Sequence, residues 1–216
     1  MTVERDDRTA DPRRAWLVGG VLLLVGPFLA PILHTMPVPV PWLGFVLAAV
    51  YPAALIVYAY GLPGGSVTAR RPLGTAALTV LAAWILATSI AWPPILGPDP
   101  DEGLIAVFVV VDPVVRVAAA LIAVVQIGRA RVVPPPWNWA PSWALAAIVV
   151  TGVGGQAVAM TSPASGLDLT MTLFTVDSLV RAAASVLLGV LSIVLAARRA
   201  PAEPVVVYRS PDGLDA

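Results

Sequence analysis

Two short segments of the sequence each place an acid and a base four residues apart in apolar surroundings. VDPVVR contains Asp112 and Arg116, and VDSLVR contains Asp177 and Arg181. Residues i and i+4 lie on the same face of an α-helix, so each Asp can pair with the Arg of its own segment. A guanidinium also matches a carboxylate or a phosphate, so the same side chains can bind an anion.

The composition indicates that these charges belong to an integral membrane protein. Of 216 residues, 58% are hydrophobic and 12% are charged, and the mean hydropathy is +0.87, whereas a soluble domain is about 25% charged. The net charge of zero argues against nucleic acid as a partner. The chain has no Cys and one His, which excludes disulfides and metal sites built on Cys or several His residues. It has no Lys, so Schiff-base cofactors are excluded too.

Six apolar runs are each long enough to cross about 30 Å of hydrocarbon. Segments rich in Pro and Gly separate them, as expected of loops. We therefore predict an all-α fold of six transmembrane helices between residues 15 and 199, with disordered cytoplasmic tails at 1–14 and 200–216. The predicted spans are 15–34, 41–61, 73–96, 104–128, 141–160 and 171–197.

The arginines predict the orientation of these spans. Arg pairs precede the first run, follow the second, fourth and sixth runs, and are missing from the other three loops, two of which carry acids. Cytoplasmic loops of membrane proteins are enriched in Arg and Lys. We therefore expect both termini in the cytoplasm. The basic residues are all Arg, and the residues Ala, Val and Pro are abundant. This composition favours a bacterial origin, so we expect the protein to lie in the plasma (inner) membrane of a bacterium.

The two charged segments also belong to an internal repeat. FVVVDPVVRVAAA aligns with LFTVDSLVRAAAS at a single offset, and VYPAAL of the second run is a weaker match with Tyr51 in place of the Asp. Spans two, four and six would then be equivalent. This predicts three helical hairpins that all run in the same direction, which is a parallel repeat.

The depth of the charges decides how they must be arranged. At 1.5 Å per residue, the acids lie roughly 9–12 Å and the arginines roughly 15–18 Å below the outer membrane edge. A lone Arg at the centre of a span costs about 2.5–3.5 kcal/mol, so these side chains must pair or face water. Pairing within each helix and crossed pairing, which joins Asp112 to Arg181 and Asp177 to Arg116, both remain open.

Uncharged polar residues accompany the charges in the outer half of the spans. Tyr51, Thr88, Ser89 and Gln156 lie at similar depths, whereas the inner halves are almost entirely apolar. Such one-sided polarity does not make a continuous channel lining. It favours either a pocket that opens to the outside or a closed structural clamp.

Two functional hypotheses follow from these residues. In the first, the chain is a structural or accessory membrane subunit whose Asp and Arg side chains fix helix packing or hold a membrane-protein partner or a second copy. In the second, it binds or transports a small anion, solute or lipid headgroup, with Arg116 and Arg181 as the anion clamp. We predict no catalytic residue, metal or cofactor, because the sequence lacks the phosphate-binding and nucleophile motifs that such chemistry requires.

Overall fold

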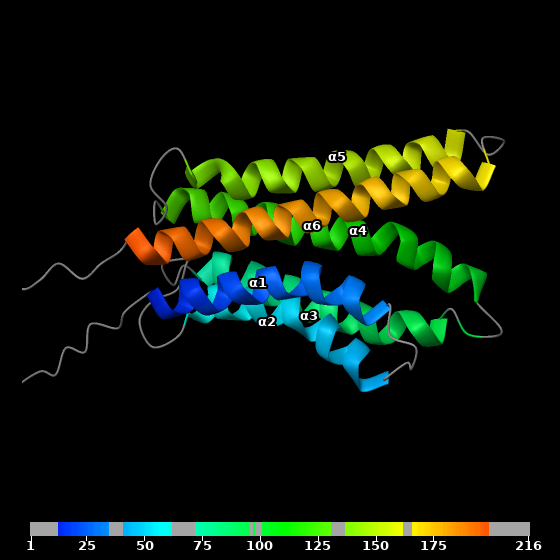
Figure 1. Ribbon diagram of the computed structural model, residues 1–216. Coiled ribbons are helices and arrows are strands. Elements are labelled where there is room, and N and C mark those ends of the chain that lie inside the picture. The colour runs from blue at the N-terminus through cyan, green and yellow to red at the C-terminus, as the bar shows by residue number, and fades with distance from the viewer. Residues whose placement is uncertain are drawn as a thin grey trace, which may run out of the picture.

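The computed structural model describes residues 13–34, 41–61, 72–95, 97, 101–130, 137–161 and 166–198, and these form an all-helical bundle (Figure 1). The predicted helical fold is therefore confirmed. Of the predicted tails at 1–14 and 200–216, residues 1–12 and 200–216 lie outside the described residues, while Arg13 and Arg14 form the start of the first helix. The elements are α1 (Arg13–His34), α2 (Pro41–Tyr60), α3 (Pro72–Ile95), α4 (Glu102–Ala130), the short 3-10 helix η1 (Trp137–Trp139), α5 (Ala140–Thr161) and α6 (Gly166–Arg198).

Five of the described helices, α2 to α6, are long and apolar enough to cross a membrane. At 1.5 Å per residue, the 22 residues of α1 also reach about 33 Å. The largest difference from the predicted spans is in α6, which begins at Gly166 rather than at residue 171. Hydropathy marks the apolar part of a helix, and polar residues at its end extend the helix beyond that part.

The six long helices form a ring in which each packs against its neighbours in the chain. The contact between α1 and α6 closes the ring and is the most extensive, while the contact between α4 and α5 is the sparsest. Helices α2 and α3 pack as closely as the two helices within each predicted hairpin. Packing alone therefore does not single out three hairpins, and the repeat stays a prediction.

The buried core lies at one end of the ring. We call this the terminal half, because α1 begins and α6 ends there, and we call the other end the far half. Among the described residues, every buried side chain except Thr88 belongs to the terminal half. The terminal half comprises residues 13–23, 52–61, 72–83, 117–130, 137–149 and 184–198.

Glycines and hydrogen bonds close the terminal half between α1 and α6. A Cβ atom at Gly20 would lie 2.8 Å from the carbonyl oxygen of Gly189, so the two backbones touch. At the helix ends, Arg13 donates from Nε to the carbonyl of Ala196 at 3.0 Å. Small residues permit such close crossings in membrane bundles.

Tyr58 links α2 into the same packed region. Its hydroxyl donates to Ser192 Oγ of α6 at 2.8 Å, and its ring meets Trp16 of α1 edge-on at 6.1 Å between centroids. Gly19 leaves room for this ring, because a Cβ there would lie 2.6 Å from two of the ring atoms. The terminal half is therefore closed by both apolar and polar contacts.

The far half is more loosely packed. In Figure 1 the hairpin of α5 and α6 moves away from α3 and α4 toward the far end, and the first part of α2 turns away from the bundle. Prolines inside the helices include Pro27 in α1, Pro52 in α2 and Pro113 in α4, where the missing N–H favours a bend. The structure thus combines a closed half with an open one, and the charged segments lie where the two meet.

Candidate functional site

The first charged segment forms an ion pair within α4 that is held by α3. Arg116 Nε donates to Asp112 Oδ1 at 2.7 Å. Trp84 of α3 donates its indole N–H to the same oxygen at 2.9 Å, and an Nη of Arg116 donates to the hydroxyl of buried Thr88 at 2.9 Å. Helix α3 therefore contacts both the acid and the base.

The second charged segment forms an equivalent pair within α6 that is held by α5. Arg181 Nε donates to Asp177 Oδ2 at 2.6 Å, and Thr151 of α5 donates to Asp177 Oδ1 at 3.1 Å. The backbone of α5 also lies beside the pair, because a Cβ added at Gly152 would be in ordinary contact with an Nη of Arg181, at 3.5 Å, and with Asp177 Oδ1, at 3.7 Å. Each pair is thus supported by the preceding helix in the chain.

The pairing is within helices and not between them. Among the described residues, the ion pairs join Asp112 with Arg116 and Asp177 with Arg181, and no crossed pair is formed. The arginine side chains are 35% and 51% exposed, and the acids 26% and 20%. A single buried four-member network is therefore not what the structure has, since i,i+4 spacing satisfies each charge locally.

Tyr51 lies near both ion pairs. It comes from α2, and its phenol is within electrostatic range of both Arg116 and Arg181. Helices α2, α4 and α6 alternate around the ring, so residues from all three can approach one another only in its centre. Tyr51 keeps 40% of its surface exposed.

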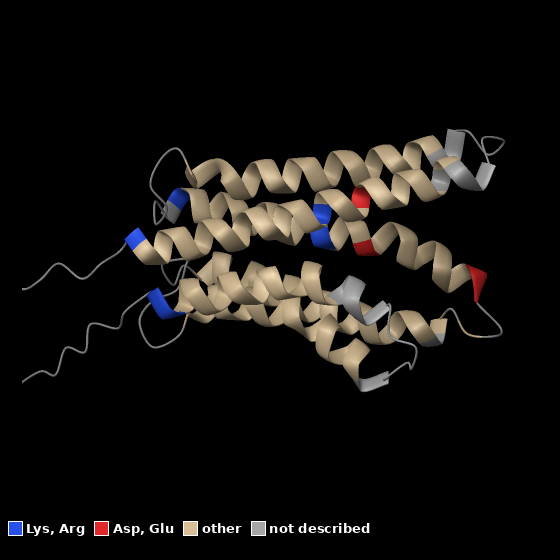
Figure 2. Ribbon diagram, in the orientation of Figure 1, with Lys and Arg blue, Asp and Glu red and all other residues tan. Residues whose placement is uncertain are grey.

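The two pairs also lie at one level along the bundle. In Figure 2 the charged residues of the described helices appear only at the helix ends and in one band near the middle. This band marks the boundary between the closed terminal half and the far half. A ligand that reached it from the far half would meet the arginines at the floor of the open part.

The guanidiniums keep unused donors. Arg181 uses only its Nε for hydrogen bonds to the described residues, so both of its Nη groups are available. Arg116 uses its Nε and one Nη, so its other Nη is available. Planar N–H donors of this kind bind carboxylate and phosphate oxygens with short, charge-assisted hydrogen bonds. The chemistry that this arrangement can perform is recognition of an anionic group.

The other predicted polar residues divide into participants and bystanders. Tyr51 and Thr88 join the charged pairs, as described above. Ser89 bonds to the carbonyl of Ile85 in its own helix, and exposed Gln156 has no hydrogen bond to the described residues.

Sequence reasoning missed three contributors to the site, namely Trp84, Thr151 and Gly152. The indole N–H of Trp84 binds Asp112. Thr151 directly precedes the segment GVGGQ of α5, which begins with Gly152. The available signal was that Thr151 is a polar residue in an apolar span.

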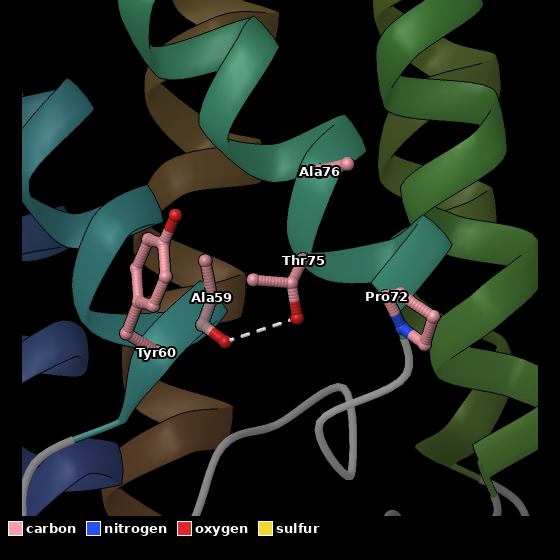
Figure 3. Close-up of a pocket in the computed structure, with 5 residues that line it drawn as sticks. All are labelled: Ala59, Tyr60, Pro72, Thr75 and Ala76. Carbon is pink, nitrogen blue, oxygen red and sulfur yellow. Dashed lines mark hydrogen bonds between the residues drawn. The ribbon is translucent and has the colours of Figure 1, made fainter.

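A separate hollow lies away from the charged residues. It is open, has a volume of about 510 Å³ and lies between the end of α2 and the start of α3 (Figure 3). There Thr75 donates to the carbonyl of Ala59 at 3.4 Å. The described residues that line it are Ala59, Tyr60, Pro72, Thr75 and Ala76. None of these five is charged, and none is a predicted site residue. The hollow is therefore not part of the charged site.

No group of three or more His, Cys, Asp or Glu side chains that could hold a metal ion occurs among the residues in the described ranges. Comparison with protein-family models, with curated proteins and with solved structures gives no significant match for this chain. The geometry of the two ion pairs is therefore the main indication of function.

Proposed function

We propose that this chain is a polytopic membrane protein that binds an anionic group, a phosphate or a carboxylate, at Arg116 and Arg181. The observation that carries the proposal is the state of Arg181, which is 51% exposed and engages only Nε. An arginine that served only to fix helix packing would be expected to use its remaining donors, because unpaired charge is costly in a membrane.

The acids have a supporting role in this proposal. Asp112 and Asp177 each bind Nε of an arginine, which fixes the direction of the guanidinium and offsets its charge while the site is empty. Trp84 and Thr151 hold these acids in turn. The Nη groups can then receive an anion without a large rearrangement, which lowers the entropic cost of binding.

The closed terminal half suggests how the site is reached. Because the buried residues gather there, an anion would arrive through the far half and stop at the arginines. Release to the terminal side would require the contact between Gly20 and Gly189 to open. We therefore propose a one-sided binding site, with transport only if the terminal half opens.

We also propose the membrane arrangement that the sequence predicts. Helix α1 would be a sixth span, because it packs between α2 and α6. Both termini would be cytoplasmic, since Arg13, Arg129 and Arg198 lie toward one end and Glu102 toward the other (Figure 2). The chain would be a bacterial inner-membrane protein of three parallel hairpins, with Tyr51, Asp112 and Asp177 at equivalent positions.

One observation favours a second candidate, the structural or accessory subunit. Each ion pair is also bonded to the preceding helix, through Thr88 or Thr151, so the pairs contribute to helix packing. The exposed part of Arg181 would then face a membrane-protein partner or a second copy of the chain.

Binding of two phosphate probes tests the proposal. Purified protein in a neutral detergent is titrated with dioleoyl phosphatidic acid and, separately, with inorganic phosphate, and affinities are compared for wild type and Arg181→Gln. A hydrogen bond to a charged group is worth about 1.5–3 kcal/mol, so the substitution should weaken binding by about tenfold to a hundredfold.

The matched control is Arg129→Gln, which removes the same charge from an exposed position at the end of α4. This variant should bind like wild type. If neither probe binds wild type, or if both arginine variants weaken binding equally, the anion site is wrong and the accessory role becomes the better account.

A further inference from the structure

We infer that the anion is the phosphate headgroup of a lipid, which enters sideways from the bilayer through the contact between α4 and α5. This inference rests on the proposed function and names its ligand class and its route. The lipid would place its headgroup at the two arginines and keep its acyl chains against apolar helix surfaces.

The contact between α4 and α5 is where the ring can be entered most easily. It is the sparsest contact between neighbouring helices, and only 6% of the residues in each of these two spans are buried, against 33% in α3. The two helices also separate toward the far end in Figure 1. Little packing has to be broken to admit a chain molecule there.

This contact also lies between the two ion pairs. The pair of Asp112 and Arg116 is on α4 and bonds to α3, while the pair of Asp177 and Arg181 is on α6 and bonds to α5. A headgroup that entered between α4 and α5 would therefore have one arginine on each side. Among the helices as the structure describes them, no other contact between chain neighbours has a charged pair on both sides of it.

The apolar surfaces of α4 and α5 distinguish a lipid from a dissolved anion. Between Gly103 and Asp112, residues 104–111 of α4 read LIAVFVVV and include no polar side chain. Val107 and Val110 of α4 are 56% and 64% exposed, and Val150 and Val153 of α5 are 70% and 57% exposed. A hydrated phosphate gains nothing from such surfaces, whereas acyl chains are compatible with them.

Photolabelling in nanodiscs tests the lipid and its route together. The nanodiscs contain phosphatidic acid with a diazirine near the end of one acyl chain, and a parallel sample contains phosphatidylcholine with the same labelled chain. We expect phosphatidic acid to label the far halves of α4 and α5, including Val110 or Val153, several-fold more than phosphatidylcholine does. The excess should disappear in the Arg116→Gln/Arg181→Gln variant, persist in Arg129→Gln, and resist a hundredfold excess of inorganic phosphate.

Three results would overturn the inference. Equal labelling by the two lipids would mean that the labelled chains report only the surrounding bilayer. An excess on α1 or α2 would refute the route between α4 and α5. Full competition by inorganic phosphate would show that a dissolved anion is the ligand, and the proposed function would still stand. If instead neither phosphatidic acid nor inorganic phosphate binds the wild-type protein, the proposed function itself fails.

Discussion

Replacing Gly189 by Ala tests the closure of the ring most sharply. An added Cβ would lie 2.9 Å from the carbonyl oxygen of Gly20 and 2.9 Å from Leu24 Cγ. The first of these atoms is backbone, so it cannot move away by changing a rotamer. Helices α1 and α6 would have to separate by several tenths of an ångström at their closest point.

The size of the effect follows from two opposing terms. Overpacking of a close contact costs about 1–3 kcal/mol, while replacing Gly by Ala inside a helix gains about 0.8–1.0 kcal/mol. Gly26 and Gly154 are matched controls, because nothing lies within 4 Å of a Cβ added at either position. Gly189→Ala should therefore have a free energy of unfolding about 1–3 kcal/mol lower than the control variants.

Reversible unfolding in mixed micelles of a mild detergent and SDS, followed by tryptophan fluorescence, measures this difference. Gly20→Ala should behave like Gly189→Ala, since its Cβ would meet the Gly189 carbonyl. If Gly189→Ala unfolds at the same SDS fraction as Gly26→Ala and Gly154→Ala, α1 and α6 do not cross as closely as described, and the argument for a closed terminal half fails.

Three further predictions concern single contacts and topology. Tyr58→Phe should lower the free energy of unfolding by about 1 kcal/mol, because it removes the 2.8 Å hydrogen bond to Ser192 of α6. Tyr60→Phe, at an exposed position, is the control and should have less effect. Equal losses in the two variants would contradict the role of this bond. Thr151→Val should lower the free energy of unfolding by about 1–3 kcal/mol in the same assay, since it removes a hydrogen-bond donor from the carboxylate of Asp177. An unchanged free energy of unfolding would refute that contact. Because the chain has no cysteine, a single Cys can be placed at Leu104 or at Gly128. A membrane-impermeant maleimide added to whole cells should label the Cys at position 104 and not the Cys at position 128. The opposite pattern would reverse the proposed orientation.

The helices could be predicted well because hydropathy and chain breakers act locally. The predicted span 41–61 compares with Pro41–Tyr60 in the structure, and 141–160 with Ala140–Thr161. The order of helices around the ring could not be predicted in the same way. It depends on where glycines such as Gly20 and Gly189 meet, and that is a tertiary contact without a pattern in either segment alone.

The candidate site could be predicted in its composition but not in its geometry. The spacing of Asp112 and Arg116 permitted both local and crossed pairs, and only the placement of α3 and α5 decides between them. The prediction that polarity is confined to one half identified the level of the site. It did not identify Trp84 or Thr151 as its supports, since a single polar group in an apolar span has many packing alternatives.

The central claim is that the charges form a binding site and not a clamp. The most direct test compares unfolding of wild type with that of the combined Asp112→Asn, Arg116→Gln, Asp177→Asn and Arg181→Gln variant, each with and without phosphatidic acid. At about a hundredfold excess over Kd, the lipid should raise the free energy of unfolding of wild type by about 2.7 kcal/mol and leave that of the variant unchanged. Without lipid, the variant should be at least as stable as wild type, because functional charges are kept at a cost to stability. A variant that unfolds much more easily than wild type, together with a wild type that does not respond to the lipid, would show that the charges hold the helices together and would contradict the account.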